Sequence, residues 1–376
     1  AAELDAALAE GLPRDARVGR AGLERRYEKA LRGETGLETA ERDARGRLFR
    51  SRVERPGRPG RDLTISLDAR LQTLAYELLG GDAPAAQGYR GVIAAMKPDT
   101  GELLALAVRP TFDPERPGAA PREGEEISYL NRAVMELYPP GSPYKIVTSL
   151  AALRAGRPPS YRINCTGSYR IPEAPRRVFR DHNNPAGYGW LDLPDALKFS
   201  SNVYYYQTAW EIGVEGQLAA ARLLGFDRLT GVDLPGEAQS ALAKMDPSTL
   251  QPGEIVLMGI GQGPVAVTPL QVLRAICAVA TRGRLPTPHI GLALTDAFGR
   301  REALNPPPPE RLAVPPDYFE AIIEGMYRVC YAQGGTASKA GFPPGWRVCG
   351  KTGTAERPPA EPDAWFVGFA PRENPE

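Results

Sequence analysis

The residues best suited to chemistry begin with Ser142 and Lys145, which follow a chain-breaking Pro-Pro-Gly segment. Pro143 fits the first position of a helix, so we expect Ser142 at a helix N-terminus and Lys145 one turn on, on the same face. A serine hydroxyl is a weak nucleophile until a base accepts its proton, and a desolvated lysine can be that base. The helix dipole at this end favours a developing oxyanion. Taken alone, the pair is better explained by a capping serine beside a surface lysine.

Two further short motifs carry polar groups that could face the same cleft. Ser200 and Asn202 lie two residues apart, between two segments that are typical of helices. Lys351 and Gly353 share one face of a predicted strand, and Thr352 points to the other. Because glycine in a strand permits close approach, a cation and hydroxyls there suit a peptide carboxylate. Alone, each motif also fits an ordinary turn or a surface strand.

The elements that must position these residues follow from periodicity and from capping signals. Asp68 and Thr268 are predicted N-caps, one before the apolar repeat 71–79 and one before a helix that begins with Pro269. The other predicted elements are helices at 23–31 and 317–330, a hairpin of 91–97 with 103–108, and paired strands at 346–356 and 364–370. Strands near both ends with mostly helical chain between them indicate an α+β fold.

Composition excludes several classes of function. The chain has 376 residues with 46 basic and 45 acidic side chains, a net charge of +1, so it lacks the concentrated positive charge of a nucleic-acid-binding protein. No apolar run approaches the roughly 18 residues of a membrane helix. Four cysteines, at 165, 277, 330 and 349, show neither paired metal-ligand spacing nor a dense disulfide framework.

The three motifs occur in an order that resembles the penicillin-binding proteins and class A β-lactamases. Together they resemble the class B, monofunctional penicillin-binding proteins most closely, and further segments support this: Gly261-Gln-Gly263 with Val267-Thr-Pro-Leu-Gln271, Gly231-Val-Asp-Leu-Pro235, and Trp365-Phe-Val-Gly-Phe-Ala-Pro371. The double proline before Gly141, Phe179-Arg-Asp181 and Tyr204-Tyr-Tyr-Gln207 are more similar to the elongation subtype, penicillin-binding protein 2, than to the division subtype.

The resemblance implies a catalytic role for each motif residue. Ser142 would attack the carbonyl of a peptidoglycan stem peptide that ends in D-Ala-D-Ala, with Lys145 as its base. Ser200 would relay the proton to the leaving amine, and Asn202 would hold the substrate amide. Lys351 would set the positive potential, Thr352 and Thr354 would bind the terminal carboxylate beside Gly353, and the N–H groups of Ser142 and Thr354 would form the oxyanion hole. No cofactor is required, and β-lactams should acylate the nucleophile.

The resemblance also implies the organisation of the chain. Residues 63–376 would be the transpeptidase domain, an antiparallel sheet with flanking helices plus an all-helical part. Residues 1–62 would be the C-terminal part of a pedestal module, in which Gly19-Arg-Ala-Gly-Leu-Glu24 resembles the family. We expect missing segments at both ends and in loops such as 116–126 or 357–362. We also expect an inner-membrane anchor that this chain lacks, a catalytic domain outside the cytoplasm, and a RodA-type glycan polymerase as the partner of the pedestal.

Four alternatives remain open at this point. The first is a division-type transpeptidase. A β-lactam hydrolase or sensor is the second, and for a hydrolase Glu237 is the candidate to activate water. The third is a non-enzymatic activator of a polymerase. The fourth is a metal site at Cys165, Asp181 and His182, which we do not favour because the three lack tight ligand spacing.

Overall fold

The structure is a computed structural model that describes residues 18–81, 90–113, 115–116, 127–182 and 184–376. The loop near 116–126, where we expect a missing segment, lies largely outside the described residues, as do residues 1–17. The chain divides into two units. Unit 1 combines residues 1–66 with 233–235 and 289–306, and unit 2 holds 67–232, 236–288 and 307–376. The boundary that we expect at residue 62 remains a prediction.

Unit 1 holds α2 (Gly22–Arg26), α3 (Glu28–Arg32), β1 (Leu37–Arg42), β2 (Leu48–Arg55), β3 (Asp62–Ile65), β11 (Gly291–Thr295) and β12 (Arg301–Ala303). The single helix predicted over 23–31 is wrong, because the helix breaks at Tyr27. The Tyr27 hydroxyl donates to Asp233 Oδ2 at 2.7 Å, and this carboxylate also accepts the N–H groups of Ile290 and Gly291. The residue at this break is thus held by a contact with residues far along the chain.

In unit 2 the predicted helix and hairpin near the N-terminal end are confirmed. Helix α4 (Ala69–Leu78) begins at Asp68, whose carboxylate accepts the N–H groups of Arg70 and Leu71. Strands β4 (Gly91–Met96) and β5 (Leu103–Arg109) pair in antiparallel fashion, and α4 packs on β5.

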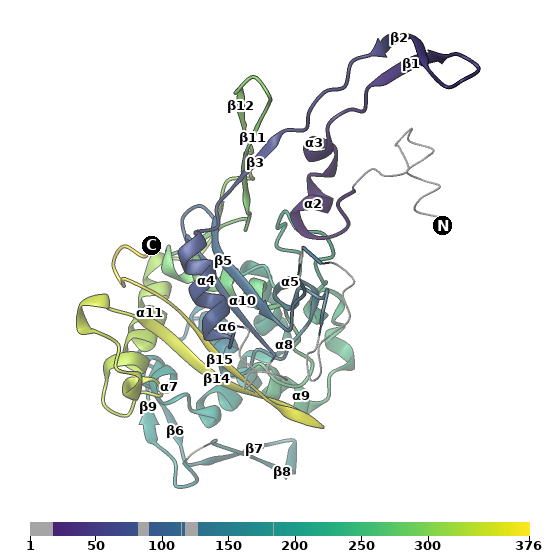
Figure 1. Ribbon diagram of the computed structural model, residues 1–376. Helices are drawn as coiled ribbons and strands as arrows, with labels where there is room; N and C mark the ends of the chain where they lie inside the picture. The colour runs from purple at the N-terminus through teal and green to yellow at the C-terminus, as the bar shows by residue number, and fades with distance from the viewer. Residues whose placement is uncertain (1–17, 82–89, 114, 117–126, 183) are drawn as a thin grey trace. The chain divides into compact units, whose positions relative to one another are not determined.

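The helices of unit 2 form its core around α6 (Lys145–Arg154), in which each residue from Lys145 to Leu153 is buried. Helices α7 (Leu193–Phe199), α8 (Asn202–Leu223), α9 (Pro252–Met258), α10 (Pro269–Ala280) and α11 (Pro316–Tyr331) complete this part. Thr268 caps α10 through a capping box, as predicted. Helix α11 packs on α7 and on strand β14 (Cys349–Arg357), and α11 lies beside this strand in Figure 1.

The strands that reach the site are β14 (Cys349–Arg357) and β15 (Ala360–Phe369), an antiparallel pair with Lys351 opposite Val367 and Gly353 opposite Trp365. The first strand begins three residues later than predicted, because Pro344–Trp346 form a 3-10 turn and Arg347 has a φ of 48°. The remaining elements of unit 2 are α5 (Arg132–Met135), β6 (Ile163–Cys165), β7 (Ser168–Ile171), β8 (Ala174–Arg180), β9 (Gly189–Leu191), β10 (Arg284–Leu285), β13 (Glu310–Arg311) and the 3-10 turns 142–144, 241–244, 247–249 and 338–340.

Candidate active site

The nucleophile candidate Ser142 opens a 3-10 turn, Ser142–Tyr144, that leads directly into α6. Gly141 before it has a φ of 58°, a left-handed conformation that favours glycine, and its N–H donates to the carbonyl of Gly261 at 2.9 Å. A Cβ on Gly141 would lie 3.1 Å from the Thr354 carbonyl oxygen. The turn is therefore held between β14 and the Gly261 loop, which fixes the position of the serine.

Lys145 is fully buried beneath this turn. Its Nζ donates to the Ser200 carbonyl at 2.6 Å, to Ser200 Oγ at 3.2 Å and to Asn202 Oδ1 at 2.7 Å. Burial lowers the pKa of Lys145 to about 7, although the negative charge of Asp181 acts in the opposite direction. This lysine can therefore lose its proton near neutral pH, as a general base must.

Ser200 connects Ser142 to the two buried lysines. It ends α7 in a left-handed conformation, with φ 55°, and its Oγ donates to Ser142 Oγ at 3.0 Å. Lys351 Nζ donates to the same Ser200 Oγ at 2.8 Å and to the Thr352 carbonyl at 2.9 Å. A continuous hydrogen-bonded path thus leads from Ser142 through Ser200 to Lys145 and Lys351.

Lys351 is as buried as Lys145. Burial and the neighbouring charge of Lys145 hold the pKa of Lys351 well below its usual range. Two like charges this close disfavour each other's protonated form. At least one of the two ammonium groups is therefore poised to release a proton.

Asp181 anchors the loop that carries Ser200 and Asn202. It follows β8, and its buried carboxylate accepts the N–H groups of Asn202 and Val203 at the start of α8. It also accepts the Ser201 hydroxyl at 3.0 Å. The helix N-terminus favours a negative charge at this position. These hydrogen bonds hold the Asp181 carboxylate in place and use both of its oxygens.

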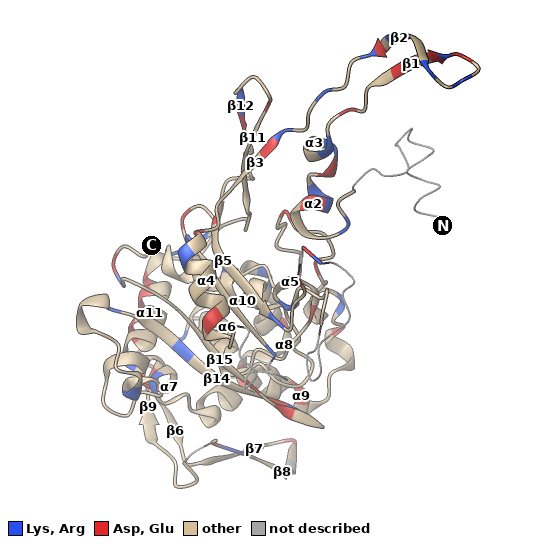
Figure 2. Ribbon diagram, in the orientation of Figure 1, with Lys and Arg blue, Asp and Glu red and all other residues tan. Residues whose placement is uncertain are grey.

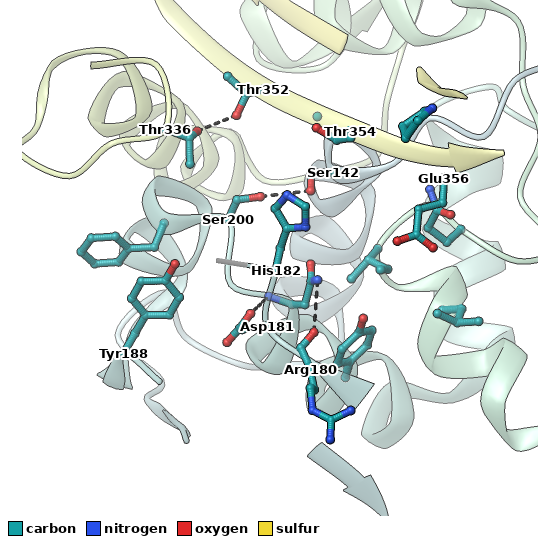
Figure 3. A pocket seen from close by; sticks show the side chains of 18 residues that line it. Ser142, Arg180, Asp181, His182, Tyr188, Ser200, Thr336, Thr352, Thr354 and Glu356 are labelled. Atoms are coloured by element: carbon teal, nitrogen blue, oxygen red, sulfur yellow. Dashed lines mark hydrogen bonds between the residues drawn. The ribbon is translucent and has the colours of Figure 1, made fainter. Parts of the chain in front are cut away.

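A cavity of about 590 Å³ opens above Ser142. The predicted site residues that line it are Ser142, Ser200, Asn202, Thr352, Gly353 and Thr354. The two lysines lie buried under its floor rather than in its wall. Figure 3 shows Ser142 and Ser200 between the helices below and the β14 threonines above.

The structure explains the glycine at position 353 differently from the sequence. A Cβ there would lie 2.4 Å from Pro143 Cδ. We expected the glycine to admit a ligand, and the structure shows that it leaves room for Pro143 of the Ser142 turn. Strand β14 and the Ser142 turn are consequently in direct contact.

Sequence reasoning missed several residues of the cavity wall, among them Thr336, Glu356 and Gln262. Thr336 Oγ1 and Thr352 Oγ1 are 2.6 Å apart and share a hydrogen bond. No local sequence pattern marks Thr336 as a site residue, because only the fold brings it next to β14. Glu356 could have been found, since it continues the alternation Thr352, Thr354, Glu356 along one strand face.

Glu237 and Cys165, which we considered for activating water and for binding a metal, are both held in the protein structure. Glu237 accepts the N–H groups of Thr230 and Gly231, at 2.7 and 3.2 Å, and does not line the cavity. Cys165 is fully buried, and burial raises its thiol pKa to about 11. Across the described ranges no three His, Cys, Asp or Glu side chains group in a way that could hold a metal ion.

Comparison with known proteins gives a consistent result. A model of the penicillin binding protein transpeptidase domain matches residues 91–376, and a model of the penicillin-binding protein dimerisation domain matches residues 1–65. Peptidoglycan D,D-transpeptidase MrdA of Haemophilus influenzae is 29% identical over 395 aligned positions, which cover 95% of this chain and 58% of the relative. The chain thus spans a little over half the length of the curated relatives that it matches.

Solved structures agree with these matches. PBP2 of Pseudomonas aeruginosa, in complex with WCK 5153, is 30% identical with a TM-score of 0.77, covering 96% of this chain and 77% of that one. A peptidoglycan synthase complex, described as coordinating polymerization and crosslinking, contains a chain that is 32% identical with a TM-score of 0.81, covering 98% and 66%.

Proposed function

The chain belongs to the penicillin-binding protein transpeptidase family, and we propose that it is a peptidoglycan D,D-transpeptidase that works through a serine acyl-enzyme. The observation that carries this proposal is the hydrogen-bonded path from Ser142 Oγ through Ser200 Oγ to two buried lysines, at the base of a cavity lined by Thr352 and Thr354. A hydroxyl that can reach a base with a lowered pKa is the requirement for nucleophilic catalysis by serine.

In the first half-reaction, Ser142 Oγ attacks the carbonyl carbon of the penultimate D-Ala of a stem peptide. The new C–O bond forms while the hydroxyl proton passes to the lysine pair, with Lys145 as the base. The amide C–N bond then breaks, and the terminal D-Ala leaves with a proton delivered through Ser200. The N–H groups of Ser142 and Thr354 stabilise the oxyanion, each donor contributing about 3 kcal/mol.

In the second half-reaction, the amine of a neighbouring stem attacks the ester carbonyl and a C–N bond forms. The ester C–O bond then breaks, and Ser142 Oγ takes up the proton that the amine loses. In the first half-reaction Asn202 holds the substrate amide, and Thr352 and Thr354 bind the carboxylate of the terminal D-Ala before it leaves, while Lys351 sets the local positive potential. The hydroxyl pair of Thr336 and Thr352 supports this placement, because the hydroxyl that accepts in their mutual hydrogen bond keeps its own proton for a ligand at this end of the cavity.

The cellular role is proposed from the relatives. The match to MrdA supports the elongation subtype, and the peptidoglycan synthase complex supports a membrane glycan polymerase of the RodA type as partner of the N-terminal module. We place the catalytic domain outside the cytoplasm of a bacterium, anchored to the inner membrane. In the part of the chain that the structure describes, no helix is long and apolar enough to cross a membrane.

The experiment that tests the enzymatic proposal is mass spectrometry after incubation with benzylpenicillin. We expect one covalent adduct, on the peptide that contains Ser142, and none on a Ser142→Ala variant. Ser248→Ala is the matched control, because Ser248 lies exposed and, among the residues that the structure describes, its hydroxyl bonds to Asp246 of its own turn alone. An unmodified wild-type protein, or an adduct at another residue, would contradict the assignment. Rapid loss of the adduct by hydrolysis would indicate a β-lactam hydrolase instead.

A further inference from the structure

The β7–β8 hairpin carries an excess of positive charge that the rest of the chain does not share. Residues 168–180 hold four arginines and one acidic residue, whereas the whole chain has 46 basic and 45 acidic side chains. The hairpin belongs to unit 2 and lies at its lower edge in Figure 1. A local charge excess of this kind indicates which partner a surface meets, since it contributes little to the fold.

The inner face of the hairpin attaches it to the helical core. Tyr169 of β7 pairs with Phe179 of β8, and both strands pack on α8. Phe179 and Ile171 are buried, and the ring of Phe179 lies 5.3 Å from the ring of Tyr206 on α8. Apolar contacts therefore hold the hairpin in place, and its outer face is not needed for this attachment.

The outer face presents arginines. Arg180 pairs with Ser168 on this face, and Arg170 lies two residues further along β7, so it points to the same side. Arg177 lies over the inner Phe179 ring, so the side chain of its neighbour Arg176 points outward. The side chains of Arg170, Arg176 and Arg180 are exposed. Arg176 and Arg180 are four residues apart, which is about 13 Å along a strand.

The protein does not neutralise this charge. Neither Arg176 nor Arg180 forms an ion pair within the part of the chain that the structure describes. By contrast, Arg328 of the same unit pairs with Asp195 at 2.9 Å. Asp181, the next residue after β8, uses both carboxylate oxygens on the start of α8. The outer face is therefore suited to an anionic partner that comes from outside the chain.

This face begins at the active-site cavity. Arg180 lines the cavity, and its side chain points away from Ser142 in Figure 3. The same view shows β14 with its threonines on one side of Ser142 and Arg180 on the other side. The arginines thus lie opposite the strand to which we assign the donor peptide, on the side from which a second strand can approach.

We propose that the outer face of the β7–β8 hairpin binds the acceptor, a peptidoglycan strand whose stem peptides carry free carboxylates. This inference rests on the proposed function. Guanidinium groups form paired, charge-assisted hydrogen bonds with carboxylates. Several such contacts along one polymer raise the effective concentration of its next stem amine at the acyl-enzyme.

The binding test uses protein that benzylpenicillin has already acylated, so that strands cannot occupy the cavity. Anisotropy is measured with labelled, soluble, uncross-linked peptidoglycan strands whose carboxylates are free or converted to amides. We expect wild type to bind the free-carboxylate strands about fivefold more tightly, and the Arg170→Gln/Arg176→Gln double variant to bind both alike, because two partly exposed charge pairs are lost. A thermal melt checks folding. Equal binding of the two polymers by wild type would overturn the proposal.

The Arg50→Gln/Arg52→Gln double variant is the matched control, because it removes the same charge from an exposed strand of another hairpin, β2. An equal loss of preference in this variant would mean that net charge, and not the β7–β8 face, determines binding. Phosphatidylglycerol vesicles test a lipid surface as the partner. Binding to vesicles that depends on Arg170 and Arg176, without binding to the free-carboxylate strands, would overturn the assignment to peptidoglycan.

A second readout is the ratio of two acyl transfers, one to a strand and one to a free fluorescent D-amino acid. The small acceptor does not reach the hairpin, so we expect the strand-to-amino-acid ratio to fall about fivefold in Arg170→Gln/Arg176→Gln, which a merely structural defect would not change. A ratio equal to that of wild type would contradict the proposal. A wild-type protein that forms no penicillin adduct would overturn the proposed function instead, so the two failures are distinguishable.

Discussion

At the scale of single residues, the mechanism that we propose depends on which buried lysine takes the proton of Ser142. Lys145 makes three donor contacts and Lys351 two, and both reach Ser142 through the one hydroxyl of Ser200. The resting geometry connects Ser142 to both lysines, and the contact with Ser200 Oγ is shorter for Lys351, at 2.8 Å, than for Lys145, at 3.2 Å. The two lysines can be told apart by replacing each with arginine, because arginine keeps its charge in proteins and cannot accept a proton.

We expect Lys145→Arg to reduce penicillin acylation by a factor of at least about 100, the loss typical of a missing general base. Lys351→Arg should lose less, because the positive charge near the substrate carboxylate survives while its geometry changes. The measurement is the second-order rate with a fluorescent penicillin, with folding checked by thermal melt. If Lys145→Arg reacts as fast as Lys351→Arg or faster, the proton must leave through Ser200 to Lys351.

The pH dependence of acylation tests whether Lys145 is the base, because a base must be neutral to accept a proton. Because the pKa of Lys145 is about 7, we expect the rate to rise with pH and to be half-maximal near pH 7. The charge of Asp181 raises that pKa, so Asp181→Asn should lower it and move the acid limb to lower pH. Asparagine can keep its oxygen on the α8 N–H groups and donate to Ser201 Oγ, so the loop keeps its bonds.

The control for the pH experiment is Asp246→Asn, since Asp246 is an exposed carboxylate that caps a surface turn. Its acid limb should coincide with that of wild type. A purely structural role for Asp181 would lower the rate at every pH without moving the limb. An acid limb that moves to higher pH in Asp181→Asn would mean that Lys145 is not the titrating base.

At the scale of elements, the site depends on how closely β14 lies against the Ser142 turn. A methyl group on Gly353 would meet Pro143 Cδ at 2.4 Å, a distance at which one of the two segments must move. We expect Gly353→Ala to reduce acylation at least about tenfold, because a displacement near 1 Å costs much of the rate. Gly345→Ala is the control, since nothing lies within 4 Å of its added Cβ. Equal rates for both variants would show that the contact does not position the nucleophile.

Local sequence patterns predicted the elements that carry their own signals. Helices α10 and α4 have a capping residue and an apolar repeat, and both were found where predicted. The β1–β2 hairpin was missed because all its residues are exposed, so it shows no alternation of burial. Thr336 was missed because its role exists only after α11 folds against β14. The sequence likewise identified the motif residues, but their contacts with one another could not be predicted because they depend on the tertiary structure.

At the scale of the whole molecule, the two units divide the residue types unevenly. The described part of unit 1 carries charges of both signs along α2, α3, β1 and β2 in Figure 2, and these four elements have no buried residue. Phe49 in β2 is 81% exposed, which is unusual for a large apolar side chain. A two-stranded hairpin is marginally stable by itself, so this surface is suited to association rather than chemistry.

The last prediction is therefore that the N-terminal segment serves binding and not catalysis. Removal of residues 1–60 keeps β3, which pairs with β11, and keeps the ion pair of Arg61 with Glu302 at 2.6 Å. It removes the Tyr27 bond to Asp233, whose carboxylate still holds the N–H groups of Ile290 and Gly291. We expect benzylpenicillin acylation within about threefold of the full chain, because the site and the core that holds it lie in unit 2.

The same truncation should abolish stimulation of a co-reconstituted glycan polymerase, measured as polymer formed from lipid-linked precursor. Tyr27→Phe in the full chain is the matched control, because it removes the Asp233 bond and leaves the β1–β2 hairpin in place. If Tyr27→Phe retains stimulation and the truncation does not, the hairpin and its flanking helices carry the interaction. A truncated protein that melts cooperatively at the wild-type temperature and yet fails to form the penicillin adduct would show that the N-terminal segment contributes to the chemistry itself.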